Sequence, residues 1–177
     1  MSSGVQRMPE SLRMSRADNN QAKQNSRWLV EQNKIEVYCS GMSPTYRRKP
    51  GSTKDWADVV RFTVNVDQDM HPGSKPVKFY IMMPDNYPNK LPMIYPDGWT
   101  LKWNSNNHTF RDRKGTVHIC TMFENQWSRE GSIAGLMMLT SIWYHKYLHW
   151  ETTKEWPGRG QYHCSKCGRP NVECNCR

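Results

Sequence analysis

The sequence lacks any apolar stretch long enough to cross a bilayer. Its longest strongly apolar run, Ile133 to Leu139, is far shorter than the roughly 20 residues that a membrane-spanning helix needs. The first residues, MSSGVQRMPE, have no apolar core of the kind that a secretory signal peptide carries. No internal repeat is present either. We therefore expect a protein of the reducing cytoplasm that has no membrane partner.

Acidic residues are few relative to basic ones. The chain of 177 residues has 16 Asp and Glu against 25 Lys and Arg, a formal net charge of +9. This length favours one domain with a small appendage, long enough to bury a core. A basic balance favours an anionic partner such as nucleic acid or an acidic protein face, although a basic surface also serves solubility alone.

Cysteine is concentrated at the C-terminus. Of six cysteines, Cys39 lies in a strand-like run and Cys120 stands alone, whereas four crowd the tail: Cys164, Cys167, Cys174 and Cys176. In a reducing compartment such a cluster indicates metal before disulfides. A CxxC pair followed by glycine suits a structural, tetrahedral Zn²⁺ site with four thiolates, and His163 is a substitute ligand. The alternative is a tail without metal.

Hydrophobic periodicity gives the order of elements. We expect a disordered segment over 1–10 and helices over about 11–32 and 132–150. Alternating apolar residues predict strands over 34–40, 58–67 and 77–83, with a short fourth strand over 93–95. A basic loop is expected over 41–54 and a long functional loop over 101–126. The fold class is therefore α+β, with helices packed on an antiparallel sheet.

The long loop contains a candidate nucleophile. Cys120 follows a basic, glycine-containing segment, and nearby positive charge lowers the pKa of a thiol. The cations within ten residues are Arg111, Arg113 and Lys114, with His118 closer still. The alternative is that Cys120 is a small buried hydrophobe, as free cysteines commonly are.

Several motifs, taken in order, resemble the ubiquitin-conjugating enzyme (E2) family. FYIMMPDNYPNKLPMIYP, from Phe79 to Pro96, resembles the third strand and proline-rich segment of that family. His108 precedes the cysteine by the expected interval, CTMFENQWS resembles the stretch after the active cysteine, and SIAGLMMLTSI resembles the following helix. The resemblance implies the E2 (UBC-like) fold, with a four-stranded antiparallel meander, over residues 11–157. Residues 158–177 then form the cysteine-rich tail.

The resemblance also implies a mechanism. Cys120 would accept a ubiquitin-like protein from an E1-like activating enzyme as a thioester, and an amine of an acceptor protein would attack that thioester. The family usually supplies its oxyanion donor from the asparagine of a His-Pro-Asn triplet. Here the triplet is His-Thr-Phe, which places Phe110 at that position. Replacement donors are Asn107, Asn106 and His118, whereas His108 is expected to hold the loop.

Other departures concern partners. Asn89, Leu91 and Arg129 stand where the family often has ligase-contacting aromatic and proline residues, so a ligase of the eukaryotic type is not expected. In this the chain resembles E2-like proteins of bacterial ubiquitin-like conjugation operons, including antiviral ones. Basic residues of the first helix would recruit the activating enzyme: Arg13, Arg16 and Lys23. Two alternatives are a non-catalytic E2-variant binding module and a basic nucleic-acid-binding protein with a zinc tail.

Overall fold

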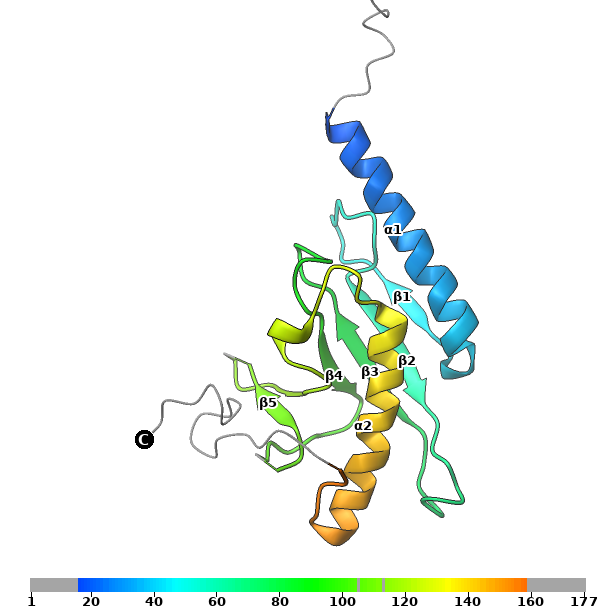
Figure 1. Cartoon of the computed structure of the whole chain (residues 1–177), viewed down its shortest axis with the longest axis vertical. Coiled ribbons are helices and arrows are strands. Elements are labelled where there is room, and N and C mark those ends of the chain that lie inside the picture. Colours follow the sequence, from blue (N-terminus) through cyan, green and yellow to red (C-terminus); the bar gives the residue numbers. More distant parts are fainter. Residues whose placement is uncertain (1–15, 105, 113, 159–177) are drawn as a thin grey trace, which may run out of the picture.

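The computed structural model describes residues 16–104, 106–112 and 114–158 (Figure 1). Two helices, α1 (Arg16–Cys39) and α2 (Ile133–Thr153), accompany one six-stranded sheet. The α+β class expected from the sequence is confirmed. None of the described helices is long and apolar enough to cross a membrane. The segments predicted to be a disordered N-terminus and a zinc-binding tail lie outside the described residues.

Helix α1 is longer than its sequence suggests, and the strand predicted over 34–40 is wrong. Trp28, Glu31, Ile35 and Cys39 are buried at intervals of three and four residues, as one face of a helix requires. Val37, predicted to share a strand face with Ile35 and Cys39, is 69% exposed. Ile35 and Cys39 are four residues apart, so the same apolar pair satisfies both a strand and a helix.

The sheet has the order β1-β2-β3-β4-β6-β5 and antiparallel neighbours throughout. Its first four strands form a meander: β1 (Thr45–Arg47), β2 (Val59–Val64), β3 (Val77–Met82) and β4 (Met93–Asp97). The remaining two form a hairpin, β5 (Thr109–Arg111) and β6 (Val117–Ile119).

The expected strand count of four is therefore too low. Strand β1 lies in the segment predicted to be a basic loop, and the β5–β6 hairpin lies in the segment predicted to be a long irregular loop. These strands have three residues each, too few to show a periodic pattern. Pairing of Ile94 with Ile119 joins the hairpin to the meander and so fixes the residue that follows, Cys120, at the sheet.

Helix α2 lies across the sheet, and α1 runs along the side of β1 (Figure 1). Phe79 of β3 meets Trp143 and Tyr144 of α2 edge-to-face, with ring centroids 6.3 and 6.0 Å apart. Much of α2 is buried, including Ile133, Leu136, Met137 and Thr140, but its outer face is not. Met138 is 42% and Ile142 54% exposed, since these two residues face away from the sheet.

Candidate active site at Cys120

The β5–β6 hairpin places Cys120. Its turn is held by the Asp112 carboxylate, which accepts hydrogen bonds from the backbone N–H groups of Lys114 and Thr116 at 2.8 and 2.9 Å. Gly115 has a φ of 81° in this turn, a conformation that favours glycine. Strands β5 and β6 remain paired as far as Thr109 and Ile119, which lie opposite each other. Cys120 is the first residue after the hairpin.

The backbone of Cys120 is anchored to His108. The N–H of Cys120 donates to the His108 carbonyl oxygen at 2.8 Å, and the indole N–H of Trp143 donates to the same oxygen at 3.2 Å. His108 has a φ of 54°, in the left-handed region that non-glycine residues seldom occupy. The sequence predicts that His108 holds the loop through its ring nitrogens, whereas the contact with Cys120 is made by its backbone carbonyl.

The Cys120 thiol is buried and protonated. The residue is 8% exposed, and its Sγ lies 3.7 Å from the Met122 carbonyl oxygen, to which the thiol donates. Burial raises the pKa of the Cys120 thiol to about 12, because a thiolate is poorly solvated there. The free protein therefore holds this sulfur as the thiol.

The prediction that neighbouring cations lower this pKa is wrong. The Arg111 guanidinium lies 4.9 Å from the centre of the Trp103 ring, and Lys114 is exposed in the hairpin turn. Arg113 lies outside the described residues. Arg111 and Lys114 are close to Cys120 in sequence, but the extended hairpin directs their side chains to other surroundings.

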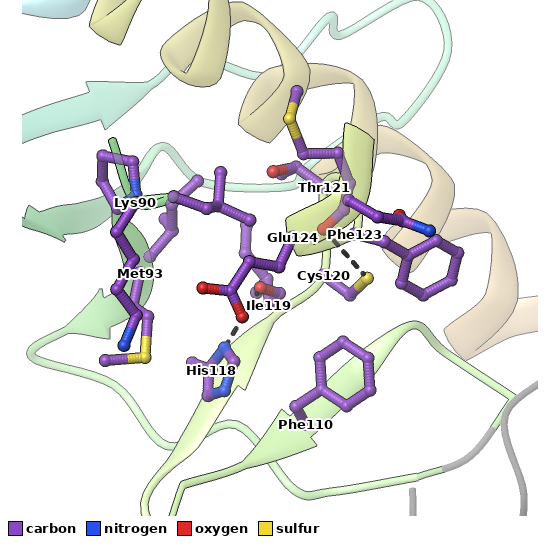
Figure 2. Close-up of a pocket in the computed structure, with 14 residues that line it drawn as sticks. Lys90, Met93, Phe110, His118, Ile119, Cys120, Thr121, Phe123 and Glu124 are labelled. Carbon is purple, nitrogen blue, oxygen red and sulfur yellow. Dashed lines mark hydrogen bonds between the residues drawn. The ribbon is translucent and has the colours of Figure 1, made fainter. Parts of the chain in front are cut away.

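Cys120 lies on a wall shared by two cavities. The larger, of about 680 Å³, is also lined by His118, Phe110, Glu124 and Asn125 (Figure 2). The smaller, of about 320 Å³, is also lined by residues of the His108 turn, of α2 and of the segment after α2: His108, Trp143, Lys146 and Trp156. Thr121, Met122 and Phe123 contribute to both. Cys120 is thus approached from two sides.

His118 is neutral in the larger cavity. Its ring lies between those of Tyr95 and Phe110, each centroid 5.6 Å away. Burial lowers the pKa of His118 and outweighs the opposing effects of the Ile119 carbonyl and the Asp112 carboxylate. A neutral imidazole in the cavity that Cys120 also lines is able to accept a proton from an incoming nucleophile.

Asn107 does not reach either cavity. It is 1% exposed, and its Oδ1 accepts a hydrogen bond from the Thr109 hydroxyl at 2.8 Å. The backbone N–H of Asn106 donates to the Asn104 side chain at 2.8 Å, which is turn chemistry. The structure therefore brings His118 and His108 to Cys120, and uses the two asparagines to build the loop.

Some cavity residues were missed by the sequence analysis. Asn125 and Thr121 line the larger cavity, and their position directly after Cys120 was the available signal. Trp143 and Trp156 line the smaller cavity, but both are distant in sequence and only tertiary packing reveals them. The cysteines predicted to bind zinc lie outside the described residues. Within the described part of the chain, no three His, Cys, Asp or Glu residues are placed to hold a metal ion.

Comparisons with known proteins find similarity among solved structures. No protein-family model matches the chain, and no curated protein matches its sequence. Among solved structures, the chain is similar to a ubiquitin-conjugating enzyme E2 from Plasmodium falciparum, at 18% identity and a TM-score of 0.46. The match covers 67% of this chain and 95% of that one. At these values the similarity by itself carries no conclusion about function.

Proposed function

We propose that the chain accepts a ubiquitin-like protein from an E1-like activating enzyme as a thioester on Cys120, and transfers it to an amine of an acceptor protein. The observation that supports this most directly is the position of Cys120 on a wall shared by two cavities. The motifs around Cys120 that resemble those of conjugating enzymes give independent support.

Two cavities suit a reaction with two substrates. In this scheme the C-terminal segment of the modifier occupies one side of Cys120, and the acceptor amine enters the other. We assign the acceptor to the larger cavity, because His118 lines it and is held neutral by burial. The two reactants then meet at the sulfur without competing for one space.

The transfer step balances with His118 as the proton carrier. The amine nitrogen attacks the thioester carbonyl, a C–N bond forms, and the C–S bond breaks. His118 takes the proton that the amine loses and returns it to the departing sulfur. That return matters because the pKa of Cys120, raised to about 12, makes a bare thiolate an unfavourable leaving group.

The developing oxyanion needs a hydrogen-bond donor. Phe110, at the position of the family's asparagine, lines the larger cavity but offers none. Thr121 and Asn125 line the same cavity and carry a hydroxyl and an amide. In our scheme the donor comes from this pair, after Cys120, rather than from the loop that precedes it.

The test is the intact mass of the protein after incubation with ATP, the ubiquitin-like protein and the activating enzyme encoded nearest to its gene. We expect an adduct of one modifier that a thiol reductant removes and that Cys120→Ala abolishes. Cys39→Ser is the matched control, because Cys39 is 2% exposed in the core and lines neither cavity of Cys120.

The alternative is a binding module that carries a modifier without chemistry. The high pKa of the buried thiol and the phenylalanine at position 110 favour it. This alternative predicts a reversible complex between the chain and the ubiquitin-like protein with no covalent adduct, in the same incubation. That negative result is decisive once the activating enzyme has been shown to form its own thioester with the ubiquitin-like protein.

A further inference from the structure

Trp156 lies beyond the end of α2 and yet contacts the loop that anchors Cys120. Its ring centroid is 4.7 Å from that of His108, with the planes inclined by 37°, and 6.1 Å from that of Trp143. Trp156 is half-buried and lines the smaller cavity together with Cys120. We propose that Trp156 is a positioning residue for Cys120, which braces the His108 turn and closes one side of the thiol's cavity.

A defined helix end directs Trp156 back to this site. Lys154 adopts a left-handed conformation with a φ of 61°, and its N–H donates to the Trp150 carbonyl at 2.8 Å. The N–H of Glu155 then donates to the Thr153 hydroxyl at 3.1 Å. These bonds end the helix and turn the chain, in the manner of a left-handed C-cap. The return of Trp156 therefore follows from local structure.

His108 transmits the contact to Cys120. Its backbone occupies an unfavourable left-handed conformation, which persists only where surrounding packing enforces it. The Trp156 ring packs on the imidazole, while the carbonyl of the same residue accepts the N–H of Cys120. A shift of His108 would thus displace the backbone of Cys120 through one hydrogen bond.

Trp156 also limits access to the sulfur. Cys120 is only 8% exposed, and the smaller cavity beside it is lined by four aromatic rings, those of His108, Phe123, Trp143 and Trp156. Removing the Trp156 indole opens that wall. Loss of the indole should therefore have two opposite effects: a small reagent reaches the thiol faster, while transfer from a misplaced thiol becomes slower.

The catalytic half of this inference rests on the proposed thioester function, whereas the structural half does not. The test therefore has two readouts on the full chain. The first is the rate of iodoacetamide alkylation at each cysteine, resolved by peptide mass spectrometry across pH. The second is the rate of thioester formation with the modifier and its activating enzyme. The variants are Trp156→Ala, Trp156→Phe and, as a matched control, Trp150→Ala. The Trp150 ring contacts that of Tyr147 at an interplanar angle of 36° and lines neither cavity of Cys120.

We expect Trp156→Ala to raise alkylation at Cys120 several-fold and to leave Cys39, buried on α1, unchanged. Thioester formation should fall about 10- to 100-fold, the cost of a misplaced reacting group. Trp156→Phe should return the alkylation rate and the rate of thioester formation most of the way to those of the unaltered chain. Trp150→Ala should alter neither rate. Equal gains in alkylation at Cys39 and Cys120 would show a general loss of stability and overturn the proposal, as would no change at Cys120. A selective gain at Cys120 with no thioester even in the unaltered chain would refute the transfer function and leave the brace standing.

Discussion

Glu31 of α1 caps the first turn of α2. Its Oε2 accepts a hydrogen bond from the backbone N–H of Ile133 at 2.8 Å, although Glu31 is fully buried. The Arg27 guanidinium lies 2.8 Å from the other carboxylate oxygen and also donates to the Gly131 carbonyl. The first N–H groups of a helix have no partner within it, and a carboxylate there also complements the helix dipole. Glu31 therefore joins the two helices at the point where the chain leaves the candidate active site.

Replacing Glu31 should destabilise the fold strongly. Glu31→Ala leaves Arg27 and the Ile133 N–H without their buried partner, so we expect the free energy of unfolding to fall by about 3 kcal/mol. Glu31→Gln retains an acceptor and should cost less. Urea denaturation followed by tryptophan fluorescence gives the difference. Glu36→Ala is the control on the exposed face of the same helix, and a loss equal to that of Glu31→Ala would contradict the capping role.

Asp58 should make stability fall in acid. Burial alone would raise the pKa of Asp58, but the Lys49 N–H at 2.8 Å and the Lys54 ammonium at 2.9 Å lower it to about 2. A pKa lowered on folding contributes stability above the unfolded value of 3.8, and this is lost as the pH falls from there through about 2. The contribution is about 2 kcal/mol at neutral pH. Asp58→Asn should remove it and flatten the unfolding free energy between pH 5 and 2; an unchanged slope would contradict it.

The elements predicted correctly are those whose periodic pattern is long and matches burial. In β2, Val60, Phe62 and Val64 are buried in alternation, and the expected strand contains them. Helix α2 begins one residue after the expected Ser132, which accepts the Gly135 N–H as its N-cap. The prediction failed at 34–40, because residues four apart, such as Ile35 and Cys39, lie on one face of a strand and also on one face of a helix.

The candidate site was predictable where its residues are close in sequence. His118 and Cys120 line one cavity, as expected from their spacing. The ionisation of Cys120 was not predictable, because it depends on burial created by distant elements and not on nearby charges. Trp156 was missed for the same reason, since its contact with His108 exists only after α2 has packed on the sheet.

The cysteine-rich tail remains a prediction from sequence alone. If Cys164, Cys167, Cys174 and Cys176 hold a structural ion, the protein purified without chelator should contain about one zinc per chain, bound by four thiolates. Plasma mass spectrometry measures the metal content. A paired Cys164→Ser and Cys167→Ser variant should lose the zinc, whereas Cys39→Ser should keep it. Zinc-free protein from cells grown with zinc would argue for a tail without metal.

His118 should matter for discharge of the thioester and little for its formation. Once Cys120 is loaded, His118→Gln should slow transfer to free lysine about 100-fold, the usual contribution of a general base. Burial keeps the pKa of His118 below 6.5, so its base form predominates at neutral pH and is lost as the pH falls through that lowered value. The ratio of the transfer rate of the unaltered chain to that of His118→Gln should therefore be constant above pH 7 and decline in acid. Taking the ratio cancels the effect of ionisation of the lysine itself.

The control is His149→Gln, because His149 is an exposed histidine of α2 that lines neither cavity of Cys120. This variant should discharge the thioester at the normal rate. A ratio independent of pH would assign His118 to packing between Tyr95 and Phe110 instead of proton transfer.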